Sequence, residues 1–145
     1  SDFSLDKYTY CDTEGIDNFA IPEIDRRDLL PVLKEILTFN PNLKIIASPW
    51  SAPTWMKKDN NGINGGTLIG ESVYDDFAEY FVKYINDFLK NEGITIDAIT
   101  IQNEPQTQSL YYPTMEMSSS EQNTIIRDYL GRKFRDENIS NKILI

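Results

Sequence analysis

Residues 99–105 read Ile99-Thr100-Ile101-Gln102-Asn103-Glu104-Pro105, a change from β-branched apolar residues to amides, a carboxylate and a proline. The apolar part indicates a buried strand, expected over 94–102. Because proline biases the preceding residue toward extended backbone, we expect Glu104 to end the strand with its carboxylate pointing off the sheet edge. Catalytic groups of parallel α/β sheets lie at that edge. Glu104 is therefore a candidate catalytic residue, and the alternative is a surface glutamate before a turn.

Predicted helices and strands alternate along the rest of the chain. Amphipathic patterns predict helices over about 25–39, 72–93 and 118–138. The last two begin with capping-box patterns, Ser72 with Asp75 and Ser118 with Glu121. Short apolar runs predict strands at 43–48, at 94–102 and from Ile143. Long loops follow the first two strands, and this order is typical of βα repeats on a parallel sheet whose loops carry the function.

The apolar stripes of the helices are expected to face the core. The residues concerned are Leu29, Leu30, Leu33, Ile36 and Leu37 in the first helix, Phe77, Phe81, Ile85, Phe88 and Leu89 in the second, and Ile125, Ile126, Tyr129, Leu130 and Phe134 in the third. Residues 1–23 show no sustained period and are predicted to form an ordered loop. Its anchors would be aromatic: Phe3, Tyr8, Tyr10 and Phe19.

The length of the chain limits the choice of α/β fold. A closed eight-stranded barrel needs about 250 residues, and the chain has 145. A small doubly wound sheet would fit this length, but no glycine-rich phosphate turn follows either complete predicted strand. We therefore predict an α/β fold that is a fragment of a (β/α)8 TIM barrel.

Composition excludes several classes of function. The 14 basic and 23 acidic residues give a net charge of -9, which disfavours nucleic acid as a partner. The chain has no histidine and one cysteine, so imidazole bases, the usual zinc sites and internal disulfides are excluded. Residues 58–70 lack the ligand pattern of a calcium loop, and no apolar run is long enough to span a membrane. We expect neither a metal nor a cofactor, and chemistry that uses carboxylates, hydroxyls or amines.

Several segments carry a resemblance to a known family. They are Asp2-Phe3-Ser4, Tyr8-Thr9-Tyr10, Asn103-Glu104-Pro105, Tyr112-Pro113 and the tryptophan loop, residues 47–57, which reads Ala47-Ser48-Pro49-Trp50-Ser51-Ala52-Pro53-Thr54-Trp55-Met56-Lys57. In this order, and over nearly the whole chain, they resemble glycoside hydrolase family 30, the glucosylceramidase family. The resemblance implies a retaining β-glycosidase on a (β/α)8 barrel with an attached β-sandwich. Residues 1–145 would be a partial catalytic barrel domain, from the loop after the second strand to the start of the fifth, without the sandwich.

The same resemblance implies roles for single residues. Glu104 would be the general acid/base, one of two carboxyl groups that a retaining glycosidase holds about 5 to 5.5 Å apart. Asn103 would hydrogen-bond the sugar hydroxyl next to the anomeric carbon. Asp2 would accept hydrogen bonds from the outer hydroxyls, and Trp50 would offer an apolar face and an indole donor. Tyr112 would line the leaving-group side.

Some of these residues also have a purely structural interpretation. Asn103 can be an amide that ends a strand, and Asp2 can be an exposed or helix-capping aspartate. Trp55 is expected to pack the tryptophan loop rather than to bind sugar.

The catalytic nucleophile is expected outside residues 1–145, because none of the other glutamates directly follows a predicted strand. The isolated chain should therefore not turn over an activated aryl β-glucoside. The expected partners are a β-glycoside and the rest of the barrel and sandwich. The substrate stays open between β-glucosides such as glucosylceramide, a β-1,6-glucan and β-xylosides, and a sugar-binding relative without turnover is a further alternative. The resemblance favours a secreted, periplasmic or lysosomal protein.

Overall fold

The computed structural model of the chain describes residues 6–58, 62–140 and 142–144. Three short strands form one parallel sheet in the order β1-β2-β3: β1 (Ile46–Ala47), β2 (Ala98–Thr100) and β3 (Lys142–Leu144). Ile46 is opposite Ala98, and Ala98 is opposite Lys142. The predicted βα repeats on a parallel sheet are confirmed, although β1 and β2 are shorter than the apolar runs that predicted them.

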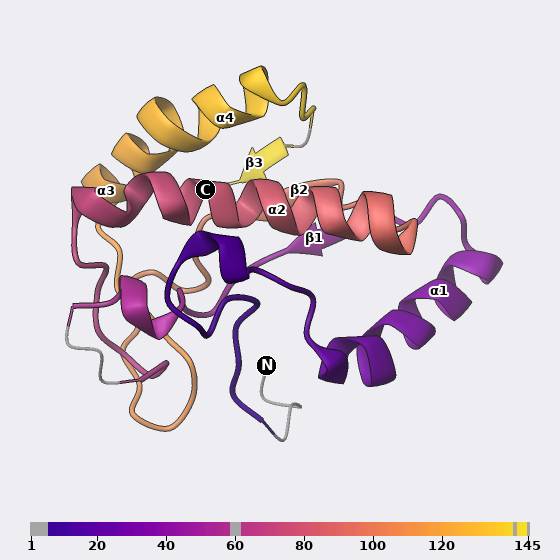
Figure 1. The fold of residues 1–145 in the computed structure, drawn as a ribbon, viewed down its shortest axis with the longest axis horizontal. Helices are drawn as coiled ribbons and strands as arrows, with labels where there is room; N and C mark the ends of the chain where they lie inside the picture. Colours follow the sequence, from indigo (N-terminus) through magenta and orange to yellow (C-terminus); the bar gives the residue numbers. More distant parts are fainter. Residues whose placement is uncertain (1–5, 59–61, 141, 145) are drawn as a thin grey trace.

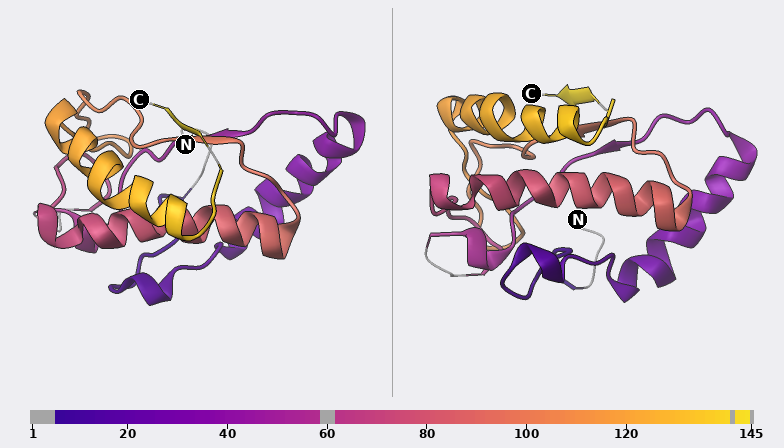
Figure 2. Two further views of the ribbon diagram at one scale, coloured as in Figure 1. Left: turned by 90° about the horizontal axis from the view of Figure 1, so that it is seen from above. Right: turned by 45° about the horizontal axis from the view of Figure 1, so that its top comes forward.

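Helices alternate with the strands along the chain (Figure 1). Their bounds are α1 (Leu30–Phe39) after the π-helical turn η2 (Asp25–Leu29), α2 (Tyr74–Glu92) after the 3-10 turn η4 (Glu71–Val73), and a continuous third helix made of α3 (Ser119–Thr124), the π-helical η5 (Ile125–Leu130) and α4 (Gly131–Asp136). α2 and the third helix run side by side next to the strands, whereas α1 lies at the edge of the molecule (Figure 2). Among the described residues, no helix combines the length and apolar content that crossing a membrane requires.

The helix starts confirm one of the two expected capping signals. Ser118 caps the third helix, since its hydroxyl accepts a hydrogen bond from the Glu121 amide at 3.2 Å. Gly93 ends α2 in the left-handed region, with φ of 69°, where a residue without Cβ is favoured. The Ser72 capping box is wrong, because η4 places Ser72 inside a 3-10 turn and leaves Val73 at the start of α2 without a side-chain cap.

The core lies between the sheet and the two parallel helices. Ile99 and Ile101 of the β2 segment are fully buried, together with Phe77 and Phe88 of α2. Phe81 and Ile85 are buried as predicted, and the third helix buries Ile125, Leu130 and Phe134. The prediction that Leu89 faces the core is wrong, because Leu89 lies in the last turn of α2 with 50% of its surface exposed.

The apolar stripe of α1 is covered only in part. Leu30 is buried, and Leu33 and Leu37 pack against the core, but Leu29 and Ile36 are exposed, contrary to the prediction. The reason is its position: α1 lies at the edge of the molecule rather than over the strands (Figure 1), so the described residues cover one side of its stripe. Its pattern alone could not distinguish a covered helix from an edge helix.

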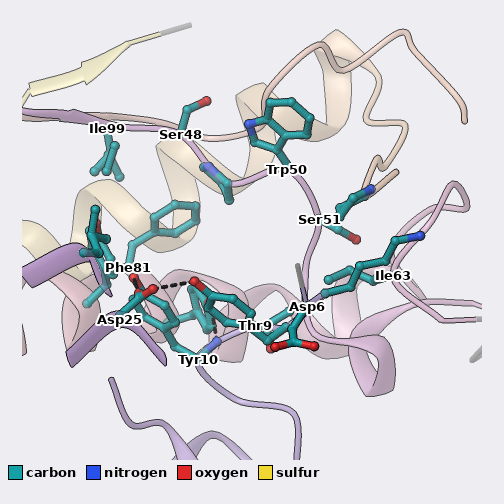
Figure 3. Close-up of a pocket in the computed structure, with 18 residues that line it drawn as sticks. Asp6, Thr9, Tyr10, Asp25, Ser48, Trp50, Ser51, Ile63, Phe81 and Ile99 are labelled. Atoms are coloured by element: carbon teal, nitrogen blue, oxygen red, sulfur yellow. Dashed lines mark hydrogen bonds between the residues drawn. The ribbon is translucent and has the colours of Figure 1, made fainter. Parts of the chain in front are cut away.

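Residues 6–22, the described part of the N-terminal segment, form an ordered loop, as predicted, which includes a short 3-10 turn at Ile16–Asn18. Tyr10 anchors it by stacking on Tyr84 and Phe88 of α2. The hydroxyls of Tyr8 and Tyr10 both donate to the buried carboxylate of Asp25, the first residue of η2 (Figure 3). Burial and the neighbouring Asp25 raise the pKa of Tyr10 well above its usual range, so it stays a donor. Phe19, a third expected anchor, packs edge-to-face against Tyr10 and Tyr80, and Phe3 lies outside the described residues.

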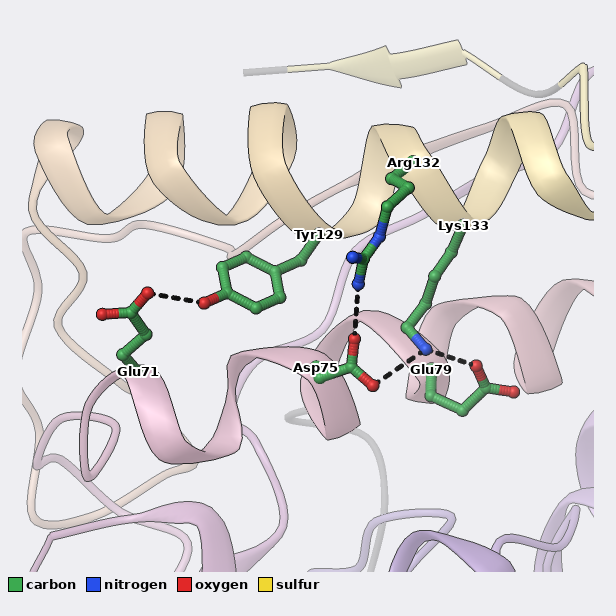
Figure 4. Close-up of polar contacts among 6 residues, drawn as sticks. All are labelled: Glu71, Asp75, Glu79, Tyr129, Arg132 and Lys133. Carbon is green, nitrogen blue, oxygen red and sulfur yellow. Dashed lines mark hydrogen bonds and ion pairs between the residues drawn. The ribbon is translucent and has the colours of Figure 1, made fainter.

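Polar side chains join α2 to the third helix along their exposed seam (Figure 4). Lys133 pairs with Asp75 at 3.1 Å and with Glu79 at 3.0 Å. Arg132 also pairs with Asp75, and the Tyr129 hydroxyl donates to Glu71. Exposed pairs of this kind contribute little to stability, so the two helices are held together mainly by their buried apolar side chains.

Candidate functional site

The loops that leave β1 and β2 stay side by side beyond the end of the sheet. The backbone N–H of Asn103 donates to the Pro49 carbonyl at 2.9 Å. The hydroxyls of Ser48 and Thr100 also form a hydrogen bond across the strands. The tryptophan loop and the Asn103–Glu104 segment are therefore held at the same edge of the sheet, the edge formed by the carboxyl ends of the strands. Enzymes built on parallel α/β sheets carry their reactive groups at this edge.

Glu104 does not have the extended backbone that its position before Pro105 predicts. Its φ is 44°, one of only two positive values for non-glycine residues in the described part of the chain. A turn follows Glu104, closed by a hydrogen bond of 2.9 Å from the Thr107 backbone N–H to the Glu104 carbonyl. A non-glycine residue in this region costs about 1 to 3 kcal/mol, and such strain concentrates at functional sites. The turn leaves the Glu104 side chain exposed at the end of β2.

The buried side chain of Gln102 connects the two loops. It is only 5% exposed, and its side-chain amide donates to the carbonyls of Trp50 and Asn103, each at 2.9 Å. The sequence pattern predicts Gln102 only as the last residue of a strand, without a functional role. The available signal was a polar residue at the end of a buried apolar run, where a buried amide needs partners.

Trp50 and Tyr112 meet across the two loops. Their ring centroids lie 5.9 Å apart with an interplanar angle of 68°, an edge-to-face contact. Both residues are half-buried, so each ring keeps accessible surface. Trp55 has the packing role expected for it, since its indole N–H donates to the Cys11 carbonyl at 2.9 Å and ties the tryptophan loop to the N-terminal loop.

Lys57 is a buried cation that sequence reasoning missed. It is 4% exposed, and its Nζ donates to Ser51 Oγ at 2.9 Å, to the Ile63 carbonyl at 3.1 Å and to the Thr114 carbonyl at 3.3 Å. Burial lowers the pKa of this ammonium group to about 8. All three acceptors are neutral, so Lys57 ties three loop segments together without an ion pair to any described residue.

A cavity of about 310 Å³ lies beside Trp50 (Figure 3). Ser48 and Trp50 line one side, and Tyr10 and Asp25 line the other. Ile99 and Phe81, which belong to the core, also line it, whereas Glu104 and Asn103 do not. The cavity therefore extends from the tryptophan loop into the layer between β2 and α2, and Asn103 and Glu104 lie outside it.

The family of this chain follows from its sequence as a whole. Residues 1–145 match the model of the glycosyl hydrolase family 30 TIM-barrel domain. The chain belongs to this family. Its parallel βα repeats are thus a fragment of a TIM-barrel domain, as predicted.

Individual relatives agree with the family. This family 30 chain is 39% identical to the endo-1,6-β-D-glucanase BGN16.3 of Trichoderma harzianum, over 99% of the chain and 32% of that protein. It is 34% identical to the lysosomal acid glucosylceramidase of Mus musculus, over 90% of the chain and 26% of that protein. The solved structure of the endo-β1,6-glucanase BT3312 superposes with a TM-score of 0.92 at 43% identity, over 99% of this chain and 32% of that one. The chain thus spans about a quarter to a third of the length of these relatives.

The structure brings four of the five predicted site residues of this family 30 chain to one edge of the sheet. They are Trp50, Asn103, Glu104 and Tyr112, all in the loops after β1 and β2. Asp2 lies outside the described residues. Across the part of the chain that the structure describes, no cluster of three or more cysteine, aspartate or glutamate side chains could hold a metal ion.

Proposed function

We propose that this chain supplies the acid/base half of the active site of a retaining glycosidase that hydrolyses β-linked glucosides. The observation that carries the proposal is the hydrogen bond from the backbone N–H of Asn103 to the Pro49 carbonyl. It places the exposed carboxylate-bearing turn at Glu104 next to the tryptophan loop. A carboxyl group and aromatic surface at the carboxyl ends of parallel strands are what sugar hydrolysis on a barrel requires.

Glu104 acts twice in the proposed mechanism. In the first step its carboxyl group donates a proton to the glycosidic oxygen while the bond from that oxygen to the anomeric carbon breaks. A second carboxylate, from outside this chain, attacks the anomeric carbon and forms a covalent glycosyl intermediate. In the second step Glu104 takes a proton from the water that displaces that carboxylate. The sugar then leaves with its original configuration.

The neighbouring residues bind the sugar. Asn103 hydrogen-bonds the hydroxyl next to the anomeric carbon, a contact that strengthens as positive charge develops on the ring. Trp50 offers one apolar ring face to the pyranose, while its edge-to-face contact with Tyr112 fixes its orientation. Tyr112 stands on the leaving-group side, and Asp2 accepts hydrogen bonds from the outer hydroxyls. The remaining groups would come from the rest of the barrel domain.

A β-1,6-linked glucan is the substrate class that the comparisons favour. The endo-1,6-glucanases reach 39% and 43% identity over 99% of the chain, against 34% for the mouse glucosylceramidase. A β-glucoside with a lipid leaving group, as in glucosylceramide, is the second candidate. A β-xyloside is the least supported candidate, because the solved family 30 xylanase is only 28% identical.

The proposal is tested by replacing Glu104 in the full-length protein. Glu104→Gln should lower kcat/KM for phenyl β-glucoside by about 10² to 10⁴, because the poor leaving group needs a proton. With dinitrophenyl β-glucoside the leaving group is dinitrophenolate, which departs without a proton. The rate at which this substrate forms the glycosyl intermediate should therefore be nearly unaffected. The matched control is Glu116→Gln, a carboxylate farther along the same segment that accepts a hydrogen bond from Gln108. Equal losses on both substrates, or none, would contradict the role of Glu104.

A further inference from the structure

The Gln102 side chain bridges two main-chain segments. Its Nε2 carries two hydrogens, and both are used: one for the Trp50 carbonyl and one for the Asn103 carbonyl. One buried amide therefore contacts the segments that carry the proposed sugar-binding tryptophan and the proposed acid/base. The pairing of β1 with β2 ends at Ala47 with Ile99, and beyond it the Gln102 side chain adds two bonds to the one between the Asn103 backbone N–H and the Pro49 carbonyl.

The orientation of this amide is fixed. Turning it over would place Oε1 against two carbonyl oxygens at 2.9 Å, so the nitrogen must face Trp50 and Asn103. In this orientation Oε1 is buried and has no hydrogen-bond partner among the described residues. Leaving a buried acceptor unpaired is unfavourable. The two donated bonds are therefore the feature that explains a glutamine at this position.

The bond to Asn103 acts directly on Glu104. The Asn103 carbonyl belongs to the planar peptide unit that joins Asn103 to Glu104, so holding this oxygen fixes the plane from which the Glu104 backbone turns. Glu104 then takes its φ of 44°. A strained conformation persists only when the surrounding contacts determine it. Here the contacts are the Gln102 amide on one side and the turn to Thr107 on the other.

We propose that Gln102 is a positioning residue, whose amide sets the spacing of the Trp50 and Asn103 main chains and so aims the Glu104 carboxyl at the leaving group. This inference rests on the proposed function of Glu104. It adds a specific requirement, that a side chain which touches no substrate governs proton donation. Small displacements of a catalytic group reduce rate without abolishing binding.

The test uses the full-length protein with Gln102→Met, which keeps the length of the side chain and removes the donor. The quantity measured is the ratio of kcat/KM for phenyl β-glucoside to kcat/KM for dinitrophenyl β-glucoside. This ratio does not depend on the fraction of folded enzyme, because both rates scale with it. We expect it to fall about tenfold, since only the first substrate needs a well-placed proton donor.

Two further variants make the result decisive. Gln102→Glu keeps the shape but sets an acceptor against two carbonyls, so the ratio should fall at least as far. The control is Gln122→Met, because the Gln122 amide also donates to a backbone carbonyl, that of Met117 at 3.1 Å. An unchanged ratio in Gln102→Met, while Glu104→Gln lowers it, would overturn the inference alone. An unchanged ratio in Glu104→Gln would overturn the proposed function, and the inference with it.

Discussion

The two loops that carry the proposed site are held in different ways. The tryptophan loop is packed into the core, with Ala52 and Met56 fully buried and Lys57 bonded to three segments. The acid loop, residues 103–113, leaves Glu104 exposed, and Leu110 and Tyr111 are 84% and 88% exposed. One loop is thus ordered by burial and the other by backbone hydrogen bonds. Substitutions of buried residues in the first loop should therefore change stability, whereas substitutions at the exposed tip of the second should change it little.

The largest effect on stability is expected from Met56→Ala. Met56 has no exposed surface, so truncation removes buried contacts and leaves a cavity, at a cost of about 3 kcal/mol in the free energy of unfolding. Urea unfolding of the full-length protein measures it. Met56→Leu is the control and should cost less than about 1.5 kcal/mol, because it conserves volume. A loss below that bound for Met56→Ala would mean that the tryptophan loop is not held by the core.

The second effect is a dependence of stability on pH that Lys57 causes. Its pKa is about 8 in the folded chain against 10.5 for an ordinary lysine, so between these values the unfolded chain binds more protons. Stability should therefore rise with pH from about 8 to 10, by at most about 2 kcal/mol. Unfolding at several pH values should show this rise in the full-length protein, and Lys57→Met should flatten it. An identical slope in both proteins would argue against the burial of the ammonium group.

The contact between the loops is expected to have an intermediate effect. Trp50→Ala, Tyr112→Ala and the double variant form a cycle whose coupling in kcat/KM should be about 1 kcal/mol, typical of an edge-to-face pair. The control cycle is Tyr74 with Tyr129, an edge-to-face pair at 5.7 Å between the helices. It should show coupling in unfolding and none in kcat/KM. If both cycles behave alike, the Trp50 contact only stabilises the fold.

Sequence patterns predicted the features that depend on neighbours along the chain. The order of helices and strands, the Ser118 cap and the end of α2 at Gly93 follow from local periods and local hydrogen bonds. The tryptophan loop and the Asn103–Glu104 motif located the candidate site for the same reason. Both are contiguous, and each directly follows an apolar run.

Features set by specific hydrogen bonds and burial, rather than by the local pattern of residue types, were missed. Glu104 departs from the extended backbone that Pro105 favours, and the Gln102 side chain holds the carbonyl that precedes it. Lys57 reads as a surface cation until Ser51, Ile63 and Thr114 surround its Nζ. The exposure of one face of α1 was also missed, because the apolar stripe of a helix does not indicate which element of the fold covers it.

The smallest effect on stability is expected at the tip of the acid loop. The backbone there is held by Lys7, which donates to the Tyr111 carbonyl at 3.0 Å, and by Asn64, which donates to the Leu110 carbonyl at 2.8 Å. The side chains of Leu110 and Tyr111 do not take part in these bonds. The double variant Leu110→Ser, Tyr111→Ser should therefore change the free energy of unfolding of the full-length protein by less than about 0.5 kcal/mol, as exposed positions do. Lys7→Met is the matched control, since it removes the backbone anchor and leaves both apolar side chains. A loss above about 1.5 kcal/mol in the double variant would show that another part of the barrel covers these side chains, and the acid loop would then be held by burial like the tryptophan loop.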